Sequence, residues 1–353
     1  MKIGLVTDLH FGARNDATAF DAHFRKFYSE TFFPHLAKLG IKTILCLGDT
    51  FDRRKFINFN TLRNCREYFF DAASDAGIEV HMLIGNHDTY FKNTNEVNSP
   101  RLLLGDYDNI VLHESVSEII IGDSKILFVP WICADNHDES IKKIKESRAD
   151  LCVGHFEFGG YQMYRDSTNP HGMDASLYTH FPLVISGHFH HRHSKGNITY
   201  MGNPYEITWS DFDDPRGFAI YDCHTNQLEY VDNPVKIFHK IYYDDSESPS
   251  GTTHKNIDVD TLKNCCIKLI VVEKNNIFEF DNFVEKLYDQ DLIDLKIIES
   301  YAAFEEDAIN DTAALEDTMS VLKEYVDSID ANIDKDRLKS ELQALYVEAQ
   351  GIL

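Results

Sequence analysis

Several features that would place this chain in a common class are missing. No stretch approaches about 18 uncharged apolar residues, so the sequence predicts no membrane-spanning helix. The seven cysteines form no CxxC pair and are odd in number, which favours free thiols in a reducing cytoplasm over a disulfide framework. Met1–Asp8 leads straight into a strand-like segment, which leaves no room for a cleavable signal. No G-x-x-x-x-G-K-[ST] motif occurs, so any coupled ATPase has to be another chain.

Positive charge is also scarce. Lys and Arg number 34 against 58 Asp and Glu, a formal net charge of −24, and such a chain should repel nucleic acid. The acidic excess is uneven, because residues 241–353 hold 10 basic and 26 acidic side chains. By contrast, 16 of the 17 histidines precede position 241. The acidic balance therefore does not exclude a nucleic-acid substrate at a site in the histidine-rich part.

The length of 353 residues and the apolar content of 43% fit two or three globular domains. Over the first 200 residues short apolar runs alternate with helical stretches such as Phe20–Leu39 and Thr61–Ala76. This alternation predicts an α/β fold of layered sheets, with polar residues gathered at the carboxyl ends of the strands. Hairpin-like runs without a helix at 110–130 predict that the sheets are mixed.

The rest of the chain has a different pattern. Asn233-Pro234 indicates a boundary, and Cys266–Val272, Asp281–Leu287 and Leu295–Glu299 read as the strand, helix and strand of a small α/β unit. Two amphipathic helices, expected to form a hairpin, follow from apolar residues at steps of three and four, among them Leu315, Met319, Leu322, Leu338, Leu342 and Leu345. The predicted domains are residues 1–232, 233–303 and 304–353.

Five short motifs each follow a predicted strand: Asp8-x-His10, Gly48-Asp49, Gly85-Asn86-His87-Asp88, Gly154-His155 and Gly187-His188-x-His190. Any one of them is common as an ordinary turn. Together they supply oxygen and imidazole ligands that suit Mn²⁺, Fe²⁺ or Zn²⁺, without the thiolates of a structural zinc site. Side chains two residues apart at a strand end can reach one ion. The five motifs in this order predict a metal site.

This set of motifs resembles the calcineurin-like metallophosphoesterase pattern. The layout is more specifically similar to the nuclease subunit of double-strand-break repair complexes, which includes bacterial SbcD, and the compact size is similar to its T-even-type phage members. Supporting residues are Pro130-Trp131, Gly202-Asn203-Pro204 and Asp214-Pro215-Arg216-Gly217-Phe218. The resemblance implies a layered metallophosphoesterase sandwich with mixed sheets, a small α/β capping domain for DNA recognition and a C-terminal helical hairpin.

The resemblance also implies roles for individual residues. One divalent ion, expected to be Mn²⁺, would lie on Asp8, His10, Asp49 and His190. A second would share Asp49 and lie also on Asn86, His155 and His188. His87 would face the scissile phosphate as a proton donor or transition-state stabiliser, and Asp88 would orient His87.

One departure from the family pattern concerns the residues after Asp49. Cellular members often carry a supporting histidine two or three residues later, where this chain has Asp52-Arg53. Arg53 or Arg54 would then contact the phosphate, or the segment is simply a solvated basic turn. His191 and Arg192, next to the last motif, are further candidates for positioning DNA.

The implied activity is 3′→5′ exonuclease on duplex ends and endonuclease on single strands, as the subunit of a recombination complex with an SMC-like ABC ATPase. The helical hairpin would dock on that ATPase. A homodimer within a heterotetramer is expected, for which Phe20, Phe24, Phe27, Tyr28, Phe32 and Phe33 supply apolar surface unless they are core. Two rivals stay open: a phosphoesterase for small phosphodiesters or phosphoproteins, and a non-catalytic scaffold of the same fold.

Overall fold

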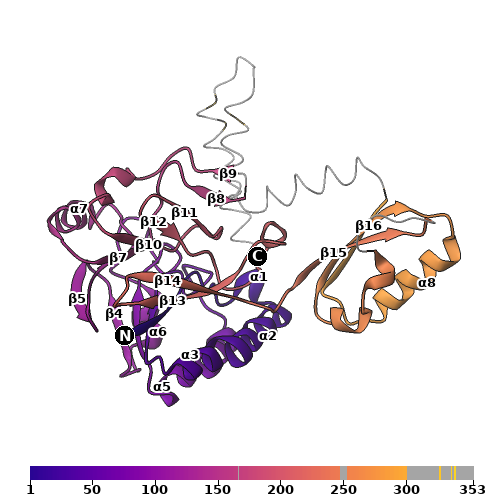
Figure 1. Ribbon diagram of the computed structural model, residues 1–353, viewed down its shortest axis with the longest axis horizontal. Helices are drawn as coiled ribbons and strands as arrows, with labels where there is room; N and C mark the ends of the chain where they lie inside the picture. The colour runs from indigo at the N-terminus through magenta and orange to yellow at the C-terminus, as the bar shows by residue number, and fades with distance from the viewer. Residues whose placement is uncertain (166, 247–252, 300–325, 327–334, 336–337, 339–353) are drawn as a thin grey trace. The chain divides into compact units, whose positions relative to one another are not determined.

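The apolar runs between residues 2 and 232 form two six-stranded sheets in the computed structural model (Figure 1). The structure describes residues 1–165, 167–246 and 253–299 and the single residues 326, 335 and 338. These residues divide into a first unit of 1–207 with 211–237 and a second unit of 208–210 with those from 238 onward.

The first sheet has the order β14-β13-β1-β2-β3-β4. Its strands are β1 (Lys2–Val6), β2 (Thr43–Cys46), β3 (Glu79–Leu83), β4 (Ile110–His113), β13 (Gly217–Asp222) and β14 (Gln227–Asp232). The strands β1 to β4 pair in parallel. Strand β13 is antiparallel to β1, and β14 is antiparallel to β13. The carboxyl ends of β1, β2 and β3 therefore meet at one edge.

The second sheet has the order β11-β12-β10-β7-β6-β5. Its strands are β5 (Ser117–Ile121), β6 (Ser124–Val129), β7 (Leu151–Gly154), β10 (Leu183–Ser186), β11 (His193–Lys195) and β12 (Ile198–Tyr200), and β8 (Gln162–Tyr164) with β9 (Ser167–Thr168) forms a separate small pair. The strands β6, β7, β10 and β12 are parallel, and the two edge strands are antiparallel to their neighbours. The prediction of mixed sheets is confirmed.

The two sheets pack face to face because their strands are apolar on both sides. Ile3 and Leu5 of β1 join Leu151 and Val153 of β7 in one buried cluster. Gly4, between them, points the other way, where an added Cβ would lie 3.0 Å from the Leu36 side chain. Because successive residues of a strand face opposite sides, β1 packs against the second sheet with one face and against the α3 residue Leu36 with the other.

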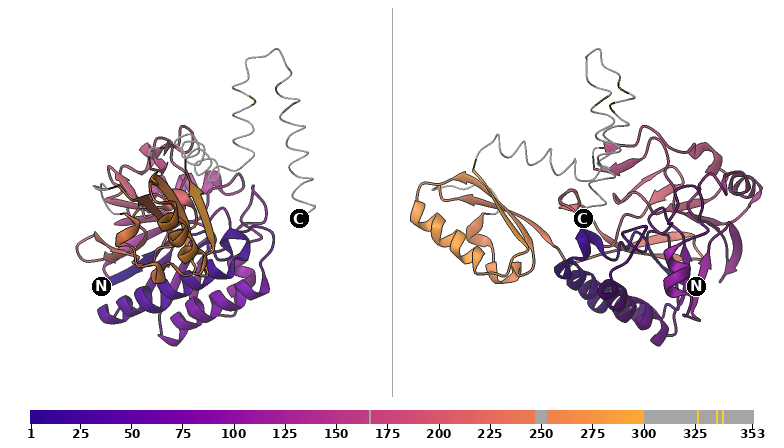
Figure 2. Two further views of the ribbon diagram at one scale, coloured as in Figure 1. Left: turned by 90° about the vertical axis from the view of Figure 1, so that its right-hand side faces the viewer. Right: turned by 180° about the vertical axis from the view of Figure 1, so that it is seen from behind.

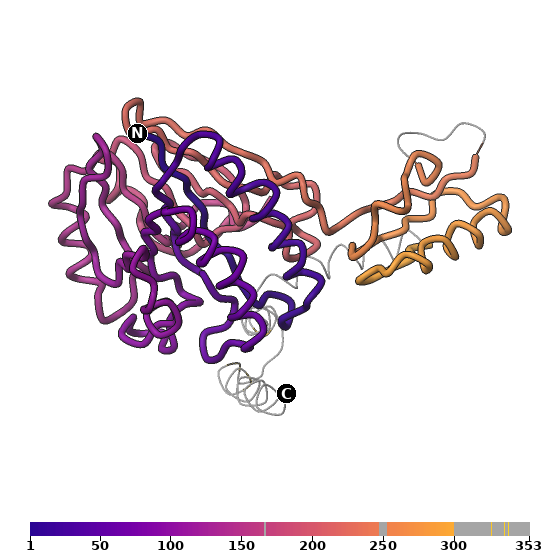
Figure 3. Tube along the Cα trace, turned by 90° about the horizontal axis from the view of Figure 1, so that it is seen from below, coloured from indigo at the N-terminus to yellow at the C-terminus, as the bar shows by residue number. Residues whose placement is uncertain are grey.

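Helices cover the outer faces of both sheets (Figures 1 and 2). Near the first sheet, two helical segments run side by side in Figure 3: α2 (Thr18–Phe27), η1 (Tyr28–Phe32) and α3 (Phe33–Leu39), and α4 (Phe59–Cys65), η2 (Arg66–Asp71) and α5 (Ala72–Asp75). The first unit also contains α1 (Ala13–Asp16), α6 (Ser99–Leu104), α7 (His137–Glu146) and η3 (Ala175–Tyr178). The short helix η4 (Trp209–Asp211) contains a boundary between the two units, after residue 210. Ile144 of α7 packs with Leu127 and Cys152 on the outer face of the second sheet. This layered α/β arrangement is the predicted fold class.

The aromatic residues of the first helical segment belong to the core. Phe20, Phe24, Phe27, Tyr28 and Phe32 are at most 2% exposed, and Phe33 is half-buried. Phe32 contacts Phe218 of β13, with ring centroids 4.8 Å apart. Of the two alternatives left open by the sequence, the core interpretation holds for the five buried rings, which therefore do not offer a surface for dimer formation.

The second unit contains a small parallel sheet, β15 (Phe238–Asp244), β16 (Cys266–Glu273) and β17 (Asp294–Ile298). Helix α8 (Ile277–Tyr288) connects β16 to β17, and short turns η5 (His254–Asn256) and η6 (Val259–Leu262) precede β16. Phe280, Phe283 and Leu287 of α8 pack on Ile267 and Leu269. The strand, helix and strand predicted here are confirmed.

Of the predicted hairpin residues, Leu315, Met319, Leu322, Leu342 and Leu345 lie outside the described residues. Leu338 is helical and half-buried. Among the residues that the structure describes, no helix combines the length and the apolar character needed to cross a membrane.

Candidate metal centre

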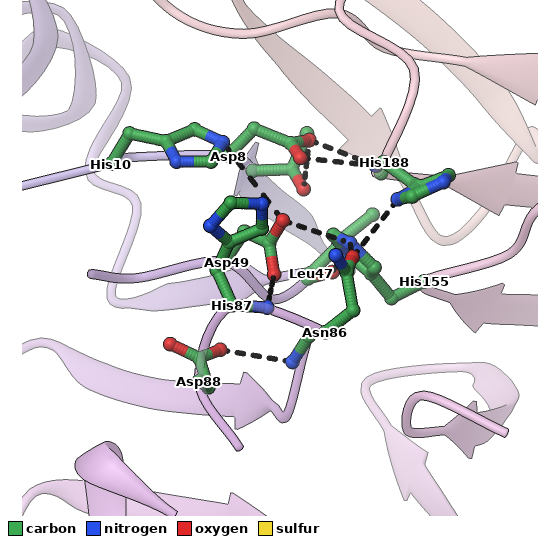
Figure 4. A network of polar contacts seen from close by, with 12 residues as sticks. Asp8, His10, Leu47, Asp49, Asn86, His87, Asp88, His155 and His188 are labelled. Carbon is green, nitrogen blue, oxygen red and sulfur yellow. Dashed lines mark hydrogen bonds and ion pairs between the residues drawn. The ribbon is translucent and has the colours of Figure 1, made fainter. Parts of the chain in front are cut away.

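Five strands from both sheets deliver polar side chains to one place (Figure 4). Asp8 and His10 follow β1, Asp49 follows β2, and Asn86, His87 and Asp88 follow β3 in the first sheet. His155 follows β7, and His188 with His190 follows β10, in the second sheet. The structure therefore brings together the strand-end residues that the sequence singled out.

The backbone at this edge is unusually strained. Asp8, His10, Asp49 and His188 have positive φ angles of 53°, 43°, 52° and 85°. Each such residue costs on the order of 1–3 kcal/mol and persists only where its surroundings hold it. Main-chain hydrogen bonds stabilise this conformation: Asp8 N–H donates to the Gly48 carbonyl at 3.0 Å, and His10 N–H donates to the Asp49 carbonyl at 3.1 Å.

Two glycines allow the loops to approach each other. Gly48 has φ of 100°, a conformation that side-chain-bearing residues rarely adopt. A Cβ at Gly85 would lie 2.1 Å from Oδ1 of Asp49, so any larger residue would displace that carboxylate. These glycines set the distance between Asp49 and the loop of Asn86.

A first ligand group consists of Asp8, His10 and His190, whose potential ligand atoms all lie within 4.8 Å of one another. The Nε2 atoms of His10 and His190 are 3.1 Å apart, and His190 Nε2 is 3.9 Å from Asp8 Oδ1. Thr7 donates its hydroxyl to Asp8 Oδ2 at 2.8 Å, which orients the carboxylate.

A second group consists of Asp49, His155 and His188, again within 4.8 Å. Oδ1 of Asn86 lies 3.0 Å from both His155 Nε2 and His188 Nδ1, so the amide oxygen faces the same point. Oδ2 of Asp49 is 3.3 Å from His155 Nε2 and 3.9 Å from His10 Nε2. One carboxylate oxygen therefore lies between the two groups, as a bridging ligand must.

Burial and mutual charge set the protonation of this cluster. Burial lowers the pKa of His188 to about 3, and the His155 charge adds to that effect. Burial also opposes the charged forms of His10 and His155, but nearby carboxylates raise the pKa of each to about 9: Asp52 and Asp49 for His10, Asp49 for His155. Although burial favours the neutral acid, the positive charge of His155 holds the pKa of Asp49 well below its ordinary value.

These residues fit two divalent cations. The donors are imidazole nitrogens with carboxylate and amide oxygens, the set preferred by Mn²⁺, Fe²⁺ and Zn²⁺. His155 donates Nδ1–H to the Leu47 carbonyl at 2.8 Å, which leaves Nε2 directed at the second group. The two ligand groups match the two ions expected from the sequence, and a cation would take the place of the protons held between imidazoles and carboxylates.

His87 and Asp88 are held differently from the expected arrangement. Nδ1 of His87 donates to the main-chain carbonyl of Asp52 at 2.6 Å, and His87 N–H donates to Asp49 Oδ1 at 2.8 Å. Asp88 accepts three main-chain bonds instead, from Thr50 at 2.9 Å, Phe51 at 3.3 Å and Gly85 at 2.9 Å. In the structure, therefore, the Asp52 carbonyl orients the His87 ring, and Asp88 fixes the loops around it. Burial, reinforced by the Asp49 charge, raises the pKa of Asp88 to about 7.

Three of the four predicted DNA-positioning residues contact carboxylates of the chain itself. Arg53 bonds to Asp16, His191 Nδ1 lies 2.8 Å from Asp214 Oδ2, and Arg192 donates to Asp232 at 2.7 Å while lying over the Tyr230 ring. Arg54 is half-buried. All four lie on the loops that carry Asp49 or His190.

The sequence did not reveal two supporting residues. Asp52 stood out only as a departure from the family, yet its carboxylate lies 3.3 Å from Nδ1 of His10. Arg216, 1% exposed, bonds to the main-chain carbonyl of His190 and pairs with Asp211 at 2.9 Å and Asp214 at 2.8 Å. The charged run Asp211–Arg216 was a signal, but its target cannot be inferred without the fold.

Comparison with known proteins places these residues in context. Residues 1–192 match the family model described as calcineurin-like phosphoesterase. Exonuclease subunit 1 of Enterobacteria phage T4 is 30% identical over 355 residues, which cover 99% of each chain. The SbcD subunit of the SbcCD nuclease from Staphylococcus epidermidis is 22% identical over 255 residues, which cover 65% of this chain and 67% of that protein. The family match spans every candidate metal ligand from Asp8 to His190.

Proposed function

This chain belongs to the calcineurin-like phosphoesterase family, and we propose that within it the protein is a dinuclear metal-dependent DNA nuclease. Its activities would be 3′→5′ exonuclease on duplex ends and endonuclease on single strands. The observation that carries the proposal is the pair of ligand groups joined through Asp49 Oδ2. The full-length similarity to a phage exonuclease subunit supports DNA as the substrate.

The chain's own residues divide the work of hydrolysis. Divalent ions, of which we propose Mn²⁺, would supply a nucleophile at neutral pH and offset the charge of the phosphoryl oxygens. His87 keeps its Nδ1 proton on the Asp52 carbonyl, so Nε2 is the nitrogen that exchanges a proton with the leaving oxygen. The main-chain bond from His87 to Asp49 ties this ring to the bridging ligand, so proton donor and ligand keep a fixed relation.

The acidic chain and its DNA substrate are compatible because the charge is local. Two bound divalent ions outweigh the carboxylates of Asp8 and Asp49, which makes the occupied site positive. Phosphate contacts by Arg54, His191 and Arg192 are part of the proposal, since these side chains lie on the ligand loops. With a net charge of −24 over the whole chain, DNA binding by this protein alone should be weak and salt-sensitive.

Partners are a further part of the proposal. Both relatives are named as subunits, and we propose that residues 304–353 dock on an SMC-like ABC ATPase in the host cytoplasm, with residues 233–303 serving as a capping domain.

A homodimer is also proposed. Phe56, Tyr90 and Leu102 line one hollow of the first unit and are 63%, 42% and 70% exposed, so they offer an apolar surface suited to a second copy.

One assay tests the function directly. Purified protein is incubated with Mn²⁺ and end-labelled duplex or circular single-stranded DNA, with and without the ATPase. The wild type should digest both substrates, whereas Asp49→Ala and His87→Ala should lose at least about 100-fold in rate because each removes a group acting in the transition state. His224→Ala, on an exposed turn, is the matched control and should retain activity.

The outcomes separate the rivals. Hydrolysis of small phosphodiesters without DNA cleavage under either condition would favour the small-substrate enzyme. Absence of bound metal together with absence of any hydrolysis would favour the scaffold. Full DNA cleavage by folded Asp49→Ala would contradict the assignment of the site.

A further inference from the structure

The three residues Arg14, Asn15 and Asp16, shortly after the ligand His10, form a left-handed turn. Their φ angles are 57°, 58° and 59°. Residues with side chains usually visit this conformation singly and not in runs, because Cβ crowds the following carbonyl. A run of three persists only where neighbouring groups hold it in place.

Two side chains from outside the turn provide that hold. Arg53 donates from Nη1 to Asp16 Oδ2 at 3.1 Å and from Nη2 to Asn15 Oδ1 at 2.7 Å. Thr61 of α4 donates its hydroxyl to the other Asp16 oxygen at 2.7 Å. Both terminal nitrogens of Arg53 are therefore used on two successive residues of the strained turn.

The turn is connected directly to a ligand. Ala13 N–H donates to the carbonyl of His10 at 2.9 Å, so the turn starts from the ligand residue itself. On the other side, Asp52 N–H donates to the Phe11 carbonyl at 3.1 Å, and the Asp52 carboxylate lies 3.3 Å from His10 Nδ1. Arg53 thus closes a ring of contacts that runs from His10 through the turn and back along the loop of Asp49.

We propose that Arg53 is a positioning residue for the first ligand group: it holds the left-handed turn at Arg14–Asp16 and thereby fixes His10, and it does not bind the substrate phosphate. The inference rests on the proposed function only in taking His10 as a metal ligand. It assigns Arg53 a role different from the phosphate contact that the sequence suggested.

Calorimetric titration of the full chain with Mn²⁺ tests the role without any substrate. The wild type should bind two ions. In Arg53→Gln one event should keep its affinity, whereas the event assigned to Asp8, His10 and His190 should weaken about 10- to 100-fold, as is typical when a support of a ligand is removed. Arg25→Gln is the matched control, because Arg25 makes a similar two-pronged contact with Glu67 at 2.7 and 3.2 Å on the helical face.

A second variant tests the role of strain. Glycine adopts left-handed backbone readily, so Asn15→Gly added to Arg53→Gln should regain part of the lost Mn²⁺ affinity. At saturating Mn²⁺, the KM of Arg53→Gln for DNA should match the wild type.

Unchanged Mn²⁺ affinity with a raised KM for DNA would overturn the proposal in favour of a phosphate contact. Equal weakening of both events, or a failure of Asn15→Gly to restore affinity, would also overturn it. Because the titration needs no hydrolysis, its result stands apart from the test of nuclease activity.

Discussion

At the scale of single residues, the sequence predicts which residues gather in the two ligand groups, but it does not predict the residues that support them. Asp8, His10 and Asn86 belong to short motifs whose members are close together in the chain, so the motifs can be recognised without knowledge of the fold. Asp52 supports His10 and His87 through contacts that exist only once β1, β2 and β3 lie side by side. The role of such a residue depends on pairing between strands, which one sequence does not specify.

Replacing Asp52 with asparagine should separate these two contacts. The main-chain carbonyl that holds His87 remains, but the charge that favours His10 in its present orientation is lost. We expect kcat to fall about 10- to 100-fold with little change in KM for DNA, measured at saturating Mn²⁺. Asp138→Asn is the control, since Asp138 also pairs with a histidine, His137 at 3.0 Å, in the exposed first turn of α7. A wild-type kcat for Asp52→Asn would contradict the positioning role.

At the scale of elements, apolar periodicity predicts the strands and helices, but it does not predict the conformation of the turns that connect them. The motifs after β1, β2 and β3 were predicted to meet because parallel strands end at a common edge. The left-handed turn at Arg14–Asp16 carries no glycine, and although Asn15 and Asp16 tolerate this conformation singly, their presence does not predict a run of three. Tertiary contacts from Arg53 and Thr61 overrule local preference there.

The loop after β3 offers a test at this scale. Gly85→Ala would place a Cβ 2.1 Å from Oδ1 of Asp49, which has to move. Because Asp49 lies between both ligand groups, the variant should lose both Mn²⁺ binding events in calorimetry. Gly159→Ala is the control, since its backbone is not left-handed and the nearest atom to a Cβ there lies at an ordinary 3.4 Å. Retention of two-ion binding by Gly85→Ala would refute the bridging position of Asp49.

A buried histidine pair between β3 and β4 predicts a pH dependence of stability. Nδ1 of His81 lies 3.0 Å from Nε2 of His113, and burial lowers the pKa of His113 to about 3, with the His81 charge adding to it. A depressed histidine pKa means that the unfolded chain binds more protons below about pH 6.5. The free energy of unfolding is therefore highest above about pH 6.5 and falls as the pH decreases from 6.5 towards 3.

Urea unfolding of the metal-free chain between pH 7 and 5 measures this effect. The free energy of unfolding should fall less steeply in His113→Gln than in the wild type, by up to about 1.4 kcal/mol per pH unit below 6.5. Parallel pH profiles for the two proteins would show that the buried pair does not contribute.

At the scale of the whole molecule, the family was predicted from the order of the motifs and not from composition. The predicted membership of the calcineurin-like phosphoesterase family is confirmed. The net charge of −24 bears on the proposed DNA substrate and carries no information about the family. Periodicity could not tell whether Phe24 and Phe32 pack inside or face a partner, because a buried helix face and an interface have the same pattern. Burial decides it: both are at most 1% exposed.

The proposed dimer is tested at this scale. Leu102, 70% exposed beside Phe56 and Tyr90, is the residue to change. Leu102→Glu should shift the full chain from dimer to monomer in light scattering, because a buried unpaired carboxylate opposes association. Phe278→Glu, at a site 74% exposed on α8, should leave the mass unchanged. A dimer that persists in Leu102→Glu would place the interface elsewhere.

The most direct measurement of the dinuclear assignment is electron paramagnetic resonance of the Mn²⁺-loaded protein. Two ions that share the Asp49 carboxylate should give an exchange-coupled signal at two ions per chain, and Asp49→Ala should abolish the coupling. Uncoupled single-ion signals from the fully loaded wild type, or coupling that survives in Asp49→Ala, would contradict it.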